Sequence, residues 1–124
     1  MRVLVASRDV RVRRALSSLL ESDGDRIVGA TEAATLLLDL DAELHPDLVL
    51  LELDRHENAQ DVTVVEALAR RGRAVIAVSG GPASGAAVLA AGARACLDKD
   101  ADFPDRLAQA LRALDGPWTS APHP

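Results

Sequence analysis

Short runs of mainly apolar residues alternate with stretches of helical periodicity along most of this 124-residue chain. Each run holds about three to five residues and shows little alternation, which is typical of strands buried on both faces of a parallel sheet. The runs predict five strands, at residues 2–6, 27–30, 48–51, 74–78 and 95–97.

The segments between these strands carry apolar residues three or four positions apart, the spacing of one helix face. Turn and capping residues bound the helices that this spacing predicts. We expect them from a cap at Ser7 or Asp9 to residues 22–24, from about Glu32 to before Pro46, over 64–70, from Pro82 to near Gly92, and over 103–114.

Five strand–helix repeats with short connections predict an α/β fold with one doubly wound sheet of five parallel strands. The predicted domain covers residues 1–115. Residues 116–124 contain glycine and several prolines and have no apolar period. They are therefore predicted to form a linker or a disordered tail.

Composition narrows the class of protein. The net charge of −5 argues against nucleic-acid binding by this domain, because phosphate contacts need a basic surface. A single cysteine, Cys96, excludes an internal disulfide and fits a reducing compartment. No stretch approaches the roughly 20 apolar residues of a membrane span. We expect a cytoplasmic domain that does not contact membranes.

The strand at residues 48–51 occupies the centre of the predicted domain. It consists of four consecutive apolar residues, and Glu52 follows it directly. Open α/β sheets place their functional groups in the crevice at the carboxyl ends of the strands. Glu52 is therefore the first candidate for a functional residue.

Four segments together carry a family resemblance: residues 2–5, 46–51, 75–79 and 91–101. On these segments the chain resembles the receiver domain of two-component response regulators, from Arg2 to Leu114. The ending Lys99-Asp100-Ala101 is similar to that of receivers attached to LuxR-type helix-turn-helix domains. The resemblance implies the flavodoxin-like (βα)5 receiver fold and a role in signal transduction.

The positions of the receiver active site depart from the family pattern. Receivers of this family transfer a phosphoryl group from a histidine kinase to an aspartate, beside Mg²⁺ held by that aspartate and an acidic pair. Here the acidic pair is Ser7 and Arg8, the phosphoacceptor position is Glu52, and Cys96 replaces the aromatic switch residue. The retained positions are Ser79 and Lys99.

These replacements predict that the usual phosphorylation is lost. Mg²⁺ needs several oxygen ligands in near-octahedral array, and a guanidinium at position 8 would repel it. We therefore expect no bound metal and no cofactor. No nucleophile and base converge at this edge either, so we expect no enzymatic activity.

Two interpretations of Glu52 remain open. In the first, Glu52 is a permanent substitute for phosphoaspartate that reaches Lys99 and Ser79, with Arg8 balancing the charge in place of the metal. In the second, the pocket has decayed, and Glu52 is solvated or paired with a nearby cation. The small side chain of Cys96 weakens the first interpretation, since it cannot swing between two positions as an aromatic ring does.

The leading hypothesis is an atypical, phosphorylation-independent receiver domain that regulates signalling or transcription through protein–protein contacts. We expect a homodimer or a partner effector protein, and a DNA-binding domain would belong to a longer parent protein. Leu36 and Leu38 lie off the apolar stripe of their helix and are candidates for the interface. The alternative is a small-molecule sensor with a ligand at Ser7, Arg8, Glu52 and Ser79.

Overall fold

The computed structural model describes residues 1–32, 34–53, 59–79 and 85–120. Within them, five parallel strands form one sheet in the order β2-β1-β3-β4-β5. The strands are β1 (Arg2–Ala6), β2 (Arg26–Thr31), β3 (Leu48–Glu52), β4 (Ala74–Ser79) and β5 (Ala95–Asp98). The predicted fold class and all five predicted strands are confirmed.

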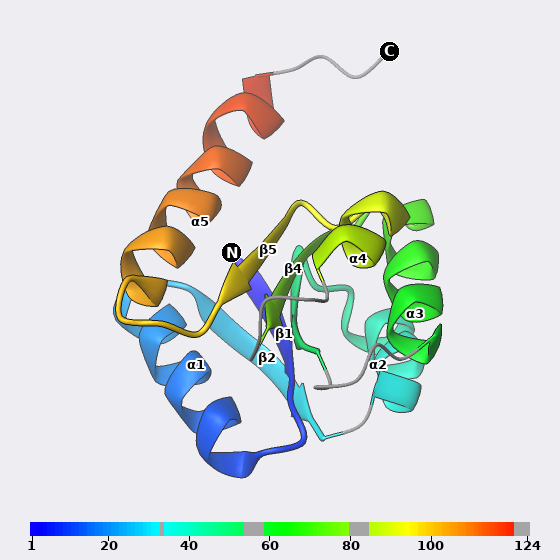
Figure 1. Cartoon of the computed structure of the whole chain (residues 1–124). Coiled ribbons are helices and arrows are strands. Elements are labelled where there is room, and N and C mark those ends of the chain that lie inside the picture. The colour runs from blue at the N-terminus through cyan, green and yellow to red at the C-terminus, as the bar shows by residue number, and fades with distance from the viewer. Residues whose placement is uncertain (33, 54–58, 80–84, 121–124) are drawn as a thin grey trace.

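Helices cover both faces of this sheet (Figure 1). One face carries α1 (Val10–Ser22) and α5 (Phe103–Ser120). The other face carries α2 (Leu37–Leu44), α3 (Ala59–Arg70) and α4 (Gly85–Ala91). A short 3-10 turn, η1 (Ala34–Leu36), precedes α2.

The core consists of two clusters, one on each face of the sheet. Val3, Val5, Leu48 and Leu50 pack toward α1 and α5, whereas Leu4 and Val49 belong to the cluster beneath α2, α3 and α4. Neighbouring residues of a strand point to opposite faces. Strands buried on both sides must therefore be apolar at every position, which explains the uninterrupted runs in the sequence.

The helix boundaries confirm some predictions and correct others. Asp9, one of the two predicted caps, is the N-cap of α1, and its carboxylate accepts a 2.8 Å hydrogen bond from the Arg11 N–H. The second helix begins at Leu37 instead of near Glu32, and no side chain caps its start. It ends at Leu44, and the C-cap residue His45, with a left-handed backbone (φ 49°), turns the chain before Pro46.

The C-terminal helix is longer than predicted. Helix α5 continues to Ser120, so residues 116–120, predicted as a linker or disordered tail, are helical in backbone. The proposed domain boundary near residue 115 stays a prediction. Two predicted features, the turn at residues 80–81 and the helix start at Pro82, lie outside the described residues.

The sheet register places the ends of the central strands at one edge. Ala6 of β1 pairs with Leu51 of β3, Glu52 pairs with Val78 of β4, and Ser79 pairs with Asp98 of β5. Residues that follow these positions meet at the same carboxyl edge. None of the helices in the described residues is long and apolar enough to cross a membrane.

Candidate functional site

Glu52 is held at the carboxyl edge by two partners. The hydroxyl of Ser7 donates a 2.6 Å hydrogen bond to Oε1 of Glu52. The ammonium of Lys99 forms an ion pair with Oε2. Only 12% of the Glu52 side chain is exposed, against 36% for Lys99. The carboxylate is thus bound on both oxygens and largely removed from solvent.

Backbone contacts position both partners of this cluster of Ser7, Glu52 and Lys99. The Ser7 N–H donates to Thr31 O at 3.0 Å, which continues the pairing of β1 with β2 beyond its last ladder residue. The Lys99 N–H donates to Ser79 O at 3.0 Å, immediately after β5. The cluster therefore follows from strand register, and its geometry does not depend on long loops.

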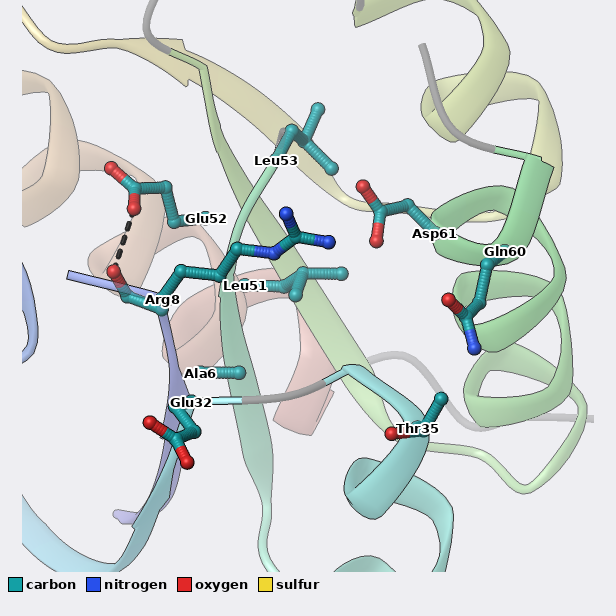
Figure 2. A pocket seen from close by; sticks show the side chains of 10 residues that line it. Ala6, Arg8, Glu32, Thr35, Leu51, Glu52, Leu53, Gln60 and Asp61 are labelled. Carbon is teal, nitrogen blue, oxygen red and sulfur yellow. Dashed lines mark hydrogen bonds between the residues drawn. The ribbon is translucent and has the colours of Figure 1, made fainter. Parts of the chain in front are cut away.

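Arg8 does not take the position that the sequence predicted. Its guanidinium points away from the Glu52 carboxylate and toward Asp61 at the start of α3 (Figure 2). The preceding residue, Ser7, is the one that binds Glu52, through its hydroxyl. The prediction that Arg8 contacts Glu52 and balances its charge is wrong. Lys99 is the cation that pairs with Glu52.

Ser79 and Cys96 lie on the strands next to this cluster. Ser79 is buried at the end of β4, and its predicted contact with Glu52 stays a prediction. Cys96 is a partly buried free thiol within β5. Burial raises the pKa of the Cys96 thiol, and the charge of Asp98 raises it further. Cys96 is therefore a poor nucleophile at neutral pH.

The two predicted interface residues have different surroundings. Leu36 is exposed over 49% of its surface, in the 3-10 turn before α2. Leu38 is partly buried and packs against the core cluster beneath α2, α3 and α4. Of the two, Leu36 is the one whose side chain is available to a partner.

A cavity of about 200 Å³ opens beside Arg8, and Figure 2 shows the side chains that line it. Residues from β1, β3, the start of α3 and the segment after β2 line it: Ala6, Ser7, Arg8, Glu32, Thr35, Leu51, Glu52, Leu53, Gln60 and Asp61. Sequence reasoning missed Glu32, Thr35, Gln60 and Asp61. Their position directly after a strand or at a helix start was the available signal.

A second charged cluster was also missed. Asp41 of α2 is fully buried and accepts hydrogen bonds from Arg71 Nη1 at 3.0 Å and from Arg73 Nε at 2.7 Å. A charged residue on the apolar face of a predicted helix was the signal. These ion pairs connect α2 to the segment between α3 and β4.

The described residues contain no group of three or more histidine, cysteine or acidic side chains arranged to hold a metal ion. Ser7 and Arg8 fit poorly to a magnesium site, because a hydroxyl and a guanidinium replace two carboxylates. The receiver resemblance implies such a metal, but the donors present at the strand ends do not suit it.

No family model matches the chain, and no curated protein matches it. Solved structures of receiver domains match its fold. The response regulatory domain of mrkE from Klebsiella pneumoniae aligns with a TM-score of 0.81 at 14% identity, covering 98% of this chain and all of that one.

Two further solved structures of response regulators also match the fold of this chain. A LuxR-family response regulator from Aurantimonas sp. SI85-9A1 aligns with a TM-score of 0.78 at 21% identity, covering 91% of this chain and 83% of that one. The isolated receiver domain of RcsB from Salmonella enterica, with a phosphomimetic, aligns at 0.77 and 22% identity, covering 93% and 88%. The chain has the fold of response-regulator receiver domains.

Proposed function

We propose that this chain is an atypical receiver domain whose output does not depend on phosphorylation at the end of β3. The observation that carries the proposal is the cluster of Ser7, Glu52 and Lys99, in which both carboxylate oxygens are engaged within the protein. A phosphoacceptor needs one oxygen free for the incoming phosphoryl group and a metal cation to neutralise the phosphate oxygens. Both oxygens of Glu52 are engaged, and the neighbouring Ser7 and Arg8 do not suit Mg²⁺.

The same cluster supports Glu52 as a permanent negative charge bound to Lys99. A pair that is partly buried is screened less than an exposed pair, so the contact persists at physiological salt. The interpretation of Glu52 as a solvated carboxylate does not fit these two contacts. The half-buried Cys96 has no aromatic ring to rotate, so the output does not pass through such a rotation on β5.

The proposed role is non-enzymatic and cytoplasmic, and it operates through protein–protein contacts. A solved structure of RcsB, whose receiver domain has the same fold, contains two RcsB dimers bound to two parallel DNAs. We propose a homodimer or an effector partner for this chain too, with any DNA contact made by another domain. The exposed side chain of Leu36 is the candidate contact from η1, and Leu89 of α4, 46% exposed, is a rival.

Phosphorylation independence is tested by adding Mg²⁺ and beryllofluoride while backbone amide shifts are followed at residues 52, 79 and 99. We expect no saturable shifts at millimolar Mg²⁺, because the acidic pair is absent. Saturable shifts at these residues would overturn the proposal.

The permanent-charge interpretation is tested with Glu52→Ala, with Glu66→Ala on the exposed surface of α3 as the control. We expect the first variant to change the oligomeric state or partner binding and the second to leave both unchanged. If Glu52→Ala behaves as the parent chain does, the pocket has decayed and Glu52 carries no signal.

A further inference from the structure

The cavity beside Arg8 lies at the topological switch point of the sheet. It opens between the carboxyl ends of β1 and β3, which are neighbours in the sheet. From β1 the chain continues through α1 to β2 on one side, and from β3 it continues through α3 to β4 on the other. Open α/β sheets bind ligands in the crevice where connections part in this way. A side chain that crosses this crevice therefore controls what can enter it.

Arg8 projects into the crevice from an anchored segment. The residue before it, Ser7, is buried, and its carbonyl oxygen accepts a 2.6 Å hydrogen bond from Arg13 Nη1. The residue after it, Asp9, is the N-cap of α1. Because both chain neighbours of Arg8 are fixed, its side chain starts from a defined position. Figure 2 shows the guanidinium extended over the cavity and directed at Asp61.

Asp61 faces Arg8 from the other wall of the crevice. It lies in the first turn of α3, and only 7% of its surface is exposed. A buried carboxylate is stable only when it is hydrogen-bonded or paired with a cation. Arg8 and Asp61 both take part in interactions within the protein. Among the side chains drawn in Figure 2, Arg8 is the cation that points at this carboxylate.

The floor below these two side chains is apolar. Ala6, Leu51 and Leu53 line the cavity and are at least nine-tenths buried. A charge pair beside such a floor is screened less than a pair in open solvent, and a buried charge without its partner is costly. Arg8 itself is exposed at the rim, so solvent reaches one side of the pair.

We propose that Arg8 and Asp61 form an ion pair that closes the crevice, a clasp between the end of β1 and the start of α3. The guanidinium of Arg8 occupies the place beside Asp61 that a small cation from solution would otherwise take. The chain thus carries its own cation at the switch point. The clasp holds the start of α3 against β1 without any bound ligand.

This proposal goes beyond the phosphorylation-independent role, which rests on the cluster of Ser7, Glu52 and Lys99. The clasp needs none of those contacts. Titration with Mg²⁺ and beryllofluoride reports on Glu52, whereas the variants of Arg8 report on Asp61. Either proposal can therefore fail while the other stands.

Rescue of Arg8→Ala by free guanidinium tests the clasp. The variant leaves Asp61 without its cation, so the start of α3 should open more often. Amide exchange at residues 63–66, the first N–H groups of α3 with helical partners, should accelerate by about tenfold or more. Guanidinium chloride, kept well below denaturing concentration, should reverse this change with saturation, because the ion refills the place beside Asp61.

Urea and sodium chloride are the matched controls for the rescue. Urea has nearly the same planar shape as guanidinium but no charge, and sodium chloride reproduces the ionic strength without the planar donors. Neither should restore the slow exchange of α3. Rescue by urea or by sodium chloride that equals rescue by guanidinium overturns the clasp, as does the absence of any saturable rescue.

Further variants locate the effect. Arg14 is exposed on α1 and does not line the cavity, so Arg14→Ala should leave exchange in α3 unchanged. Arg8→Ala combined with Asp61→Asn should not respond to guanidinium, because no carboxylate remains to bind the ion. Equal acceleration in Arg14→Ala and Arg8→Ala overturns the assignment, and so does rescue that persists without the carboxylate of Asp61.

Should Arg8→Ala fail to fold, the parent chain provides the test. An ion-paired guanidinium rotates slowly about its Cζ–Nε bond, so the Nη resonances of Arg8 should be resolved from one another. Those of the exposed Arg14 should be averaged by fast rotation. Averaged Nη resonances for Arg8 overturn the clasp.

Discussion

The hydroxyl of Ser7 donates a 2.6 Å hydrogen bond to Glu52 across the neighbouring strands β1 and β3. This contact explains why a serine suits position 7. A carboxylate there would face Glu52 at hydrogen-bonding distance and repel it without a metal between them. The Ser7 hydroxyl carries no charge, so it does not repel Glu52, and it donates a hydrogen bond to one of the two carboxylate oxygens.

The ion pair of Glu52 with Lys99 should contribute measurably to stability. A double-mutant cycle with Glu52→Gln and Lys99→Met is expected to give a coupling free energy of about 1 kcal/mol in denaturant unfolding, near the upper limit for exposed pairs because Lys99 is partly solvated. The exposed pair of Glu66 and Arg70, at 3.6 Å, is the control and should give about 0.3–0.5 kcal/mol. Equal coupling in the two pairs would show that the partial burial of Glu52 adds nothing to its ion pair with Lys99.

Introducing carboxylates at the ends of β1 and β3 should create a metal site. The combined variant Ser7→Asp, Arg8→Asp and Glu52→Asp places three carboxylates at the ends of β1 and β3, and oxygen ligands of this kind hold Mg²⁺. We expect Mg²⁺-dependent amide shifts that saturate at millimolar concentration in this variant alone. A variant that binds Mg²⁺ no better than the parent chain would show that other parts of the edge prevent binding.

The ion pairs of the buried Asp41 should contribute more to the free energy of unfolding than an exposed ion pair does. Arg73→Met leaves the carboxylate of Asp41 buried with Arg71 as its remaining cation. We expect a loss of about 3 kcal/mol in the free energy of unfolding, the lower end of the range for a broken buried pair. Arg70→Met on the exposed side of α3 should cost about 0.5 kcal/mol or less. Similar losses would refute the structural role of Asp41.

Cys96 should react slowly with alkylating agents. Because its raised pKa leaves little thiolate at neutral pH, iodoacetamide should modify the folded chain more slowly than the urea-unfolded chain at the same pH. The rate of the folded chain should rise as the pH is increased toward and beyond the ordinary range of a cysteine thiol. A folded rate equal to the unfolded one at neutral pH would contradict the burial of the thiol.

The cap of α1 should be sensitive to acid. Hydrogen bonds from the Arg11 backbone, then its side chain, lower the pKa of Asp9. A lowered folded pKa contributes stability above the unfolded value, and that contribution disappears as the pH falls through the folded value. Asp9→Asn keeps a capping side chain without the charge. Parent and variant should therefore differ in Tm at pH 7 and converge in acid, and a constant difference would exclude the charge effect.

Local signals in the sequence were sufficient for the fold. The run of Leu48 to Leu51 is apolar at every position, which only a strand buried on both faces requires. The order of strands and helices predicts that Glu52 lies at the carboxyl edge, and the receiver resemblance adds Ser7 and Lys99 to it. The late start of α2 and the length of α5 were not visible, because helix ends depend on weak capping preferences that packing overrides.

The sequence by itself determined the five strands, their parallel arrangement in one sheet and the residue types at their carboxyl ends, because the apolar runs and the helical periods are local patterns. Only the tertiary structure decided that Ser7 faces Glu52 while Arg8 turns toward α3 and lines a cavity with Asp61. The direction of a side chain at a strand end depends on partners about 45 to 53 positions away in the chain. No local pattern contains those distances.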